Sequence, residues 1–339
     1  MKLSDLIIST DPIGEELAEN LPDTAESGFE SELRSLTITE AQHGGRLDRA
    51  LVDLVPEFSR SYLQQLIESG AVILQGRPAT KPSAKVRAGE AGTIELRPTL
   101  QSQAFKPEAM ALDVVFEDEH LRVIHKPAGL VVHPAPGNWS GTLLNGLLAR
   151  DVQAQMLPRA GIVHRLDKDT SGLMVVARTR ATMDALVALI AAREVSRQYL
   201  ALAHKPWVGA ANRTVELPIG RDPRNRLRMA VVDLAVQGGK TARTDISLLH
   251  NFDQGCFVRC TLHTGRTHQI RVHMVSAGHP LVGDSVYGGA PAACLVRQAL
   301  HATQLAFVHP ITGEALKFHA PLPEDMRNAL AEWGLSYNG

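Results

Sequence analysis

The stretch GIVHRLDKDTSGLMVVAR, residues 161–178, joins a cluster of charged and turn-forming residues to an apolar run that has the composition of a buried strand. Asp, Thr, Ser and Gly are the ordinary residues of turns, so a polar loop between two strands is one interpretation. An active-site loop is the other, because functional residues often lie on loops that a rigid scaffold holds in place. Residues elsewhere in the chain decide between these interpretations.

From residue 112 onward, strand-like runs outnumber helical ones. Residues 112–134 contain two predicted strands with an acidic turn at 117–120, and residues 305–320 predict a closing hairpin. Further strands are predicted within 196–204, 213–220, 240–250 and 256–264, and helices within 140–150, 179–193 and about 267–277. Long strand runs with scattered helices, without regular βα alternation, indicate an α+β unit with a mainly antiparallel mixed sheet and flanking helices. We assign it residues 112–330.

The segment 35–98 reads as a smaller unit. SLTITE alternates like a strand, and the two segments that follow have helical spacing; Ser59 suits an N-cap and Gly70 the end of the second helix. Short strands joined by turns that contain Gly or Pro complete it. The order of these pieces, including GGRLDRAL and SRSYLQQLIESGAVILQGR, resembles the S4-like RNA-binding domain, a small α/β unit. Its basic residues are then expected to contact RNA phosphates, and the candidates are Arg46, Arg49, Arg60, Lys81 and Lys85.

The charge is distributed unevenly along the chain. The net charge is −1, yet residues 1–34 hold nine acidic and two basic side chains, a net −7, so the other 305 residues carry +6. An acidic tail with few aromatics predicts disorder, and a short helix folded onto the body is the competing interpretation. Residues 99–111 form a predicted linker.

Several classes of protein are not expected from the composition. No apolar run approaches the roughly 20 residues that span a bilayer, and no basic start precedes an apolar block as in a secretory signal. Three cysteines are too few for a disulfide framework or a zinc site. G-x-G-x-x-G and Walker-type loops are absent from the sequence, so no nucleotide cofactor is expected. Cytoplasm is the predicted location.

Three segments of the larger unit carry candidate chemistry. They contain Asp167, Tyr199, and the pair Arg266 and Arg271. An ionised Asp can act as nucleophile or base, a neighbouring Arg favours its charged form, and Tyr offers a ring for stacking and a hydroxyl for proton transfer. Each has a structural alternative: Asp167 as a turn cap, Tyr199 as core packing, and Arg271 as a surface residue or a partner of Asp284.

HRLDKDTSG, RQYLAL and TGRTHQIRVHM stand in the order of the three motifs of the RluA family of pseudouridine synthases, which this chain resembles over about residues 36–325. The resemblance implies isomerisation of uridine in RNA, without metal, redox partner or ATP. It implies that Asp167 is the catalytic carboxylate, that Tyr199 packs against the uracil and helps remove the C5 proton, and that Arg271 pairs with Asp167.

A uridine in a folded RNA must be turned out of its stack at a cost of a few kcal/mol. Arg165 could fill the gap it leaves, His164 could position the loop or contact RNA, and Arg266 is a phosphate-contact candidate near a predicted helix start. The six histidines from His250 to His301 suggest zinc, but His268 and His273 lie five apart and do not share a helical face, so no metal is expected.

The resemblance implies uridines of the helix 69 hairpin in 23S ribosomal RNA as targets, in free RNA or within large-subunit precursor particles. The same chemistry on another 23S site or on tRNA is the first alternative. An RNA-binding ribosome-assembly factor without catalysis is the second, and a carboxylate-dependent hydrolase is a distant third. A monomer is the simplest oligomeric state.

Overall fold

The computed structural model describes residues 31–97, 99, 104–225 and 228–337. The chain divides into two compact units, Met1–Lys106 and Pro107–Gly339, which we describe separately. The prediction of a disordered acidic tail over residues 1–34 falls, up to residue 30, outside the described residues. No helix among those described is both long and apolar enough to cross a membrane.

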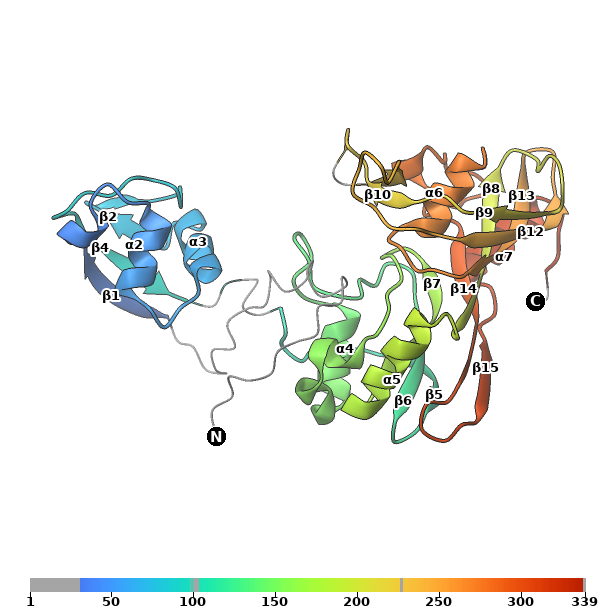
Figure 1. Cartoon of the computed structure of the whole chain (residues 1–339), viewed down its shortest axis with the longest axis horizontal. Coiled ribbons are helices and arrows are strands. Elements are labelled where there is room, and N and C mark those ends of the chain that lie inside the picture. Colours follow the sequence, from blue (N-terminus) through green and yellow to red (C-terminus); the bar gives the residue numbers. More distant parts are fainter. Residues whose placement is uncertain (1–30, 98, 100–103, 226–227, 338–339) are drawn as a thin grey trace. The chain divides into compact units, whose positions relative to one another are not determined.

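The first unit packs two helices on a small sheet. Its elements are β1 (Glu32–Thr37), η1 (Glu40–Gln42), α2 (Leu47–Leu54), α3 (Arg60–Glu68), β2 (Val72–Leu74), β3 (Arg77–Pro78) and β4 (Ala91–Leu96). The sheet order is β1-β4-β2-β3 (Figure 1). The ends of α3 agree with the sequence: Ser59 Oγ accepts a hydrogen bond from the Tyr62 amide at 3.3 Å, and Gly70 follows the helix with φ +72°.

The strand β1 differs from its prediction. It begins at Glu32 rather than near Ser35, because residues 32–34 pair with residues 94–96 of β4. Ordered structure therefore extends into the last residues of the segment that the sequence assigns to the tail. Below the sheet, Leu51 of α2 and Leu66 of α3 are fully buried in one apolar cluster with the strand residue Ile94.

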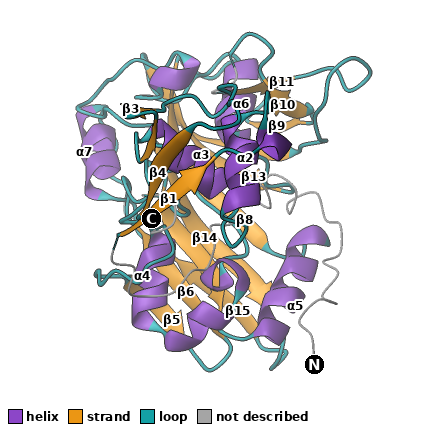
Figure 2. Ribbon diagram, turned by 90° about the vertical axis from the view of Figure 1, so that its left-hand side faces the viewer, coloured by secondary structure: helices purple, strands orange, loops and turns teal. Residues whose placement is uncertain are grey.

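The second unit is built on one large sheet. Its strands are β5 (Asp113–Glu117), β6 (Leu121–Lys126), β7 (Ser171–Ala177), β8 (Ser196–His204), β9 (Asn212–Val215), β12 (Thr244–Asn251), β13 (Gly255–Leu262), β14 (Leu300–Val308) and β15 (Ala315–His319). The order is β5-β6-β7-β14-β8-β13-β12-β9, with β15 added to β14. Figure 2 shows strands of this sheet, among them β5, β6 and β14, as one broad layer. Among the described pairings, β7 with β14 is parallel and the others are antiparallel.

The remaining elements flank this sheet. They are α4 (Leu143–Arg150), η2 (Val152–Met156), η3 (Pro158–Gly161), α5 (Arg180–Ala191), β10 (Ile219–Arg221), β11 (Met229–Val231), α6 (Gln269–Ser276), η4 (Ser285–Tyr287) and α7 (Glu324–Glu332). Figure 1 shows α5 beside the β5-β6-β7 end of the sheet and α6 beside the β12-β13 end. The predicted class, α+β with a mainly antiparallel mixed sheet and flanking helices, is confirmed.

The strand β7 is apolar throughout because both of its faces are covered. Met174 and Val176 lie in one buried cluster, while Leu173 and Val175 lie in another on the opposite face. Side chains alternate between the faces of a strand, so a strand buried on both sides reads as a continuous apolar run. This explains why LMVVAR follows the charged loop, and it gives that loop a rigid base.

Two features at the ends of this unit were not predicted. The helix α7 buries Met326, Ala329 and Leu330 and extends to Glu332, beyond the predicted end at residue 330. At the other end, Glu108 lies inside the predicted linker 99–111 but packs on the second unit: its amide donates to the Asn145 carbonyl at 3.0 Å, and its carboxylate accepts from the Gly141 amide at 2.8 Å.

Candidate active site

The charged loop 163–170 is fixed from below by a buried lysine. Lys126 ends β6, is fully buried, and donates hydrogen bonds to the carbonyls of Pro127 (2.8 Å), Leu130 (2.9 Å) and Lys168 (2.9 Å). Burial lowers the pKa of Lys126 to about 8, and the Asp169 and Asp167 carboxylates oppose this shift. One ammonium group thus ties the end of β6 to the loop.

We expect Lys126→Met to loosen this loop and to lower the free energy of unfolding by at least about 2 kcal/mol, since an unsatisfied buried acceptor costs about 1–3 kcal/mol. Denaturant unfolding measures the change. Lys168→Met is the matched control, because the Lys168 side chain is exposed and only its carbonyl accepts the bond. Equal stability of the Lys126 variant and wild type would contradict this role.

His164 lies beneath the loop rather than on its surface. Its Nε2 accepts a hydrogen bond from the Val175 amide of β7 at 3.0 Å, and burial together with the Arg197 charge lowers its pKa to about 3. A neutral, half-buried imidazole that accepts a hydrogen bond from the strand backbone suits the positioning alternative for His164. Arg165, the next residue, is exposed.

Asp167 forms part of a chain of charges with Arg271 and Asp284. Arg271 Nη1 donates to Asp167 Oδ2 at 3.1 Å, while Nε and Nη2 of the same guanidinium donate to the two Asp284 oxygens at 2.8 Å each. The side chains of Arg271 and Asp284 are 5% and 1% exposed, and that of Asp167 is 18% exposed. Burial alone would lower the pKa of Arg271, but its bonds to Asp284 and the charge of Asp167 raise it. Asp284 thus holds Arg271 in the orientation that reaches Asp167.

A second pair of side chains borders Asp167. His268 Nε2 lies 3.9 Å from Asp167 Oδ1, and His268 Nδ1 lies 2.8 Å from the Tyr287 hydroxyl. Tyr287 also packs its ring against the Arg271 guanidinium, 4.9 Å from the ring centroid. Burial lowers the pKa of His268, so the imidazole is neutral at neutral pH. His268 adopts φ +56°, a left-handed conformation that is uncommon for a residue other than Gly.

These residues open into a pocket of about 330 Å³. Its lining consists of Arg165, Asp167, Lys168, Asp169, His268, Arg271, Gly283, Asp284, Ser285, Val286, Val296, Arg297 and Gln298. Arg297 is held by Asp325 of α7, at 2.7 and 2.9 Å, and donates to the Asp169 carbonyl at 2.9 Å. The unpredicted helix α7 therefore supports one wall of the pocket.

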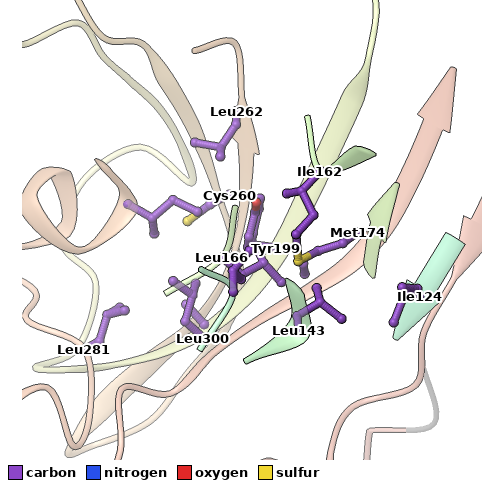
Figure 3. Packing of buried hydrophobic residues seen from close by; sticks show 14 of the residues in the cluster. Ile124, Leu143, Ile162, Leu166, Met174, Tyr199, Cys260, Leu262, Leu281 and Leu300 are labelled. Atoms are coloured by element: carbon purple, nitrogen blue, oxygen red, sulfur yellow. The ribbon is translucent and has the colours of Figure 1, made fainter. Parts of the chain in front are cut away.

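Tyr199 lies on β8 and is 6% exposed, in the same cluster of buried residues as Leu166, the neighbour of Asp167 (Figure 3). Burial raises the pKa of Tyr199 to about 12; the Arg197 charge opposes the rise and the Asp167 charge adds to it. The phenol is thus close enough to the catalytic candidate Asp167 to sense its charge.

This raised pKa gives a prediction for the pH dependence of the reaction. A pKa above its ordinary value means that the phenol keeps its proton at every pH below about 12, so only about one molecule in a thousand is ionised at pH 9. We expect the single-turnover rate not to rise between pH 7.5 and pH 9.5. A rise of tenfold per pH unit that disappears in Tyr199→Phe would show that the tyrosinate is the active species.

The other predicted RNA contacts lie in both units. Arg266 is half-buried before α6, and its Nε donates to the Thr241 carbonyl at 3.2 Å. In the first unit, Arg49, Lys81 and Lys85 are exposed. Arg46 and Arg60 share one anchor, the fully buried Asp48, at 3.0 and 2.9 Å.

Sequence reasoning missed the supports of the site more than its reactive groups. Lys126, His268 and Tyr287 were not assigned, and Asp284 was only an alternative partner. His268 and His273, the two histidines of the third motif, have different hydrogen-bond partners. His273 contacts the Thr244 hydroxyl at 2.8 Å and the Leu217 carbonyl at 3.0 Å, whereas His268 contacts Tyr287. Within the described part of the chain, no three His, Cys, Asp or Glu side chains form a group that could hold a metal ion.

With this geometry established, comparison with known proteins identifies the class. The family model described as RNA pseudouridylate synthase matches residues 120–276, and the S4 domain model matches residues 45–91. Together with the relatives described next, these matches show that the chain belongs to the RNA pseudouridine synthase family. It is an isomerase that converts uridine in RNA to pseudouridine, with an S4 RNA-binding domain at its N-terminal side.

Curated relatives are similar over most of their length. Ribosomal large subunit pseudouridine synthase D of Neisseria meningitidis serogroup A is 48% identical over 319 residues, which cover 90% of this chain and 83% of the relative. The protein of that name from Escherichia coli K12 is 44% identical over 306 residues, 86% and 91% of the two chains. Among solved structures, human RNA pseudouridylate synthase domain containing 1 superposes with a TM-score of 0.50 at 26% identity, covering 64% of this chain and 86% of that chain.

Proposed function

We propose that this chain is a ribosomal large-subunit pseudouridine synthase whose targets are uridines in the helix 69 hairpin of 23S ribosomal RNA. The names of the relatives that match both units along most of the chain support the ribosomal substrate. The hydrogen-bonded chain from the buried Asp284 and Arg271 to Asp167 at a pocket supports the chemistry. A monomeric enzyme in the cytoplasm belongs to the same proposal.

The proposed reaction needs one carboxylate at the sugar. The bond between C1′ and N1 of uracil breaks, the ring rotates, and a bond forms between C1′ and C5, whose proton is lost to solvent while N1 gains one. Asp167 acts at the ribose, either as a nucleophile at C1′ or as the base that takes a sugar proton to give a glycal. Arg271 balances its charge and fixes its orientation, with one hydrogen bond at 3.1 Å.

The remaining predicted residues hold the RNA. Tyr199 packs against the uracil and its neutral phenol assists the transfer of the C5 proton. Arg165, exposed at the mouth of the pocket, fills the space that the displaced uridine leaves in the RNA. His164 positions the loop from below, and Arg266 contacts a phosphate.

The S4 domain supplies affinity in this proposal. Asp48 accepts hydrogen bonds from Arg46, Arg60 and Gln64. These bonds lower the pKa of Asp48 below its ordinary value although burial raises it, and the bond from Arg46 has the largest effect. An ionised, buried anchor holds two guanidinium groups on the surface of the domain before RNA arrives. Less rotamer entropy is then lost when these groups bind phosphates.

A chain that begins at Pro107 tests this division of labour. It lacks the five basic candidates of the first unit, so we expect weaker RNA binding. The slope of log affinity against log salt should fall by roughly 0.7–0.9 for each phosphate that the shortened chain no longer binds. Binding titrations at several salt concentrations measure both quantities. Equal affinity and an equal slope for the full and shortened chains would contradict a binding role for the S4 domain.

The substrate is tested in cells that lack the gene. Pseudouridines are mapped chemically along 23S rRNA and tRNA before and after complementation with wild type or with Asp167→Asn. We expect helix 69 positions to be lost on deletion and restored by wild type only. Loss and restoration at another 23S position, or on tRNA, would replace the target and keep the chemistry.

A further inference from the structure

The strand β8 carries a buried arginine, Arg197, that has no counter-charge among the described residues. Arg197 is 6% exposed, its Nε is buried without a hydrogen-bond partner, and among the described residues no side chain or carbonyl forms a hydrogen bond or ion pair with its guanidinium. Buried charges in proteins are ordinarily paired, because removing an ion from water is costly. An unpaired buried guanidinium therefore points to an anion that binds from outside.

The charges around Arg197 are also positive. The pKa of Arg266 is lowered mainly by burial, and the positive charges of Arg193 and Arg197 lower it further. Arg266 is therefore close to both of these guanidinium groups. Two further titratable side chains respond to the Arg197 charge, and both are neutral at neutral pH: His164, with a pKa of about 3, and Tyr199, with a pKa of about 12. Arg193 is exposed at the end of α5, and Arg266 is half-buried. Three arginines thus share one region of positive potential.

The loop next to Arg197 packs its backbone directly against this guanidinium. Gly265, which precedes Arg266, is exposed, and a Cβ at this position would stand 2.8 Å from Arg197 Nη1. Any other residue would press on the guanidinium. Glycine here lets the backbone lie directly against Nη1, beside the Arg266 side chain.

The position of this cluster defines which anion it would meet. Arg197 and Tyr199 are two residues apart on β8, so their side chains leave the same face of the sheet, opposite Leu262 and Cys260 of β13. Tyr199 responds to the charges of both Arg197 and Asp167. Tyr199, the side chain that would stack on the uracil, is therefore close both to this cluster and to the catalytic candidate Asp167.

We propose that Arg197, Arg193 and Arg266 form a binding site for the RNA backbone phosphate next to the target uridine, with Arg197 as its buried centre. This rests on the proposed function, because the displaced nucleotide must place its base at Tyr199. A guanidinium matches the geometry of two phosphate oxygens. The site fixes the backbone on one side of the uridine while the base turns into the pocket.

The test is a binding cycle in the full-length Asp167→Asn protein, which we expect to bind RNA without converting it. The RNA is a hairpin that spans the modified position, made with native phosphates or with one neutral methylphosphonate on the 5′ or the 3′ side of the target uridine. We expect Arg197→Met to weaken binding of native RNA about 10- to 100-fold, the effect of losing a charge-assisted hydrogen bond. One of the two methylphosphonates should weaken binding to the parent protein by a similar factor. Arg197→Met and this methylphosphonate together should weaken binding no more than either change alone. Losses that multiply would contradict the proposal.

Further variants exclude a merely structural role. We expect Arg197→Met to melt at the same or a higher temperature than its parent, because it removes an unpaired buried charge. A lower melting temperature would contradict the proposal. Gly265→Ala keeps every charge but crowds Arg197 Nη1, and we expect it to weaken RNA binding. We expect the same of Arg193→Gln, which removes an exposed guanidinium from the site. Arg259→Gln is the matched control: Arg259 is exposed on β13 and points to the opposite face of the sheet, and its loss should leave affinity unchanged.

A wrong substrate is distinguished from a wrong site by two measurements. If the parent protein binds the hairpin no better than a hairpin with a scrambled loop, the proposed target is wrong. The phosphate site is then judged on any RNA that the protein binds, where Arg197→Met should reduce the salt slope by about 1. An unchanged slope together with unchanged affinity would overturn the site itself.

Discussion

Replacement of Asp167 by Asn is expected to abolish isomerisation, with a loss of at least about 1000-fold in single-turnover rate, while RNA affinity changes little. The two side chains are nearly the same size, but the amide can act neither as nucleophile nor as base. Affinity comes mainly from phosphate contacts, which this change leaves intact. Single-turnover kinetics and equilibrium binding of the same RNA measure the two effects.

Asp169→Asn is the matched control for this variant. Asp169 lies two residues further along the same loop and lines the same pocket, yet its side chain makes no ion pair among those of the described residues. We expect this variant to retain most of the wild-type rate. A similar loss in both variants would show that the negative charge of the loop matters rather than one carboxylate. Substantial turnover by Asp167→Asn would contradict the catalytic role of Asp167.

Arg271→Met is expected to lower both activity and stability. It leaves Asp284, 1% exposed, without its bidentate partner, and a buried charge that loses its partner costs about 3–5 kcal/mol. It also frees Asp167 from the bond that orients it. Denaturant unfolding should report the loss of stability, and single-turnover kinetics should report the loss of rate.

The double variant Arg271→Met, Asp284→Leu separates these two effects. Replacing a buried ion pair by apolar groups of similar size is often neutral for stability, so we expect most of the lost free energy of unfolding to return. Activity should stay lost, because Asp167 still lacks its guanidinium. If activity returned with stability, the pair would serve only the fold. If neither returned, the cost of Arg271→Met would not come from an unpaired Asp284.

The local pattern of the sequence predicts most elements of the fold. Alternation and apolar runs identify the strands, and Ser59 and Gly70 define the ends of α3. The helix α7 was missed because its apolar residues, Met326, Ala329 and Leu330, follow a segment rich in proline. The early start of β1 was missed because pairing with β4, rather than the composition of residues 32–34, orders these residues.

For the site, the sequence indicates the groups that would act but not those that support them. Asp167, Tyr199 and Arg271 belong to motifs. Asp284, the partner of Arg271, lies in the loop after α6, and only the fold brings this loop back against the helix. Lysine and arginine are rarely fully buried, so nothing in the chain marks Lys126 or Arg197 as interior residues. Three carbonyls accept hydrogen bonds from Lys126, and among the described residues none accepts one from the Arg197 guanidinium. Contacts between distant segments produce these surroundings.

The most direct test of the account is the release of tritium from uridine C5. Ribosomal RNA and tRNA from cells lacking the protein, and large subunits from the same cells, are labelled at C5 and incubated with wild type and with Asp167→Asn. The account predicts release from ribosomal RNA or subunits by wild type alone, with the modified positions in helix 69. Release from none of these substrates by wild type would contradict the central claim that this chain isomerises uridines of ribosomal RNA.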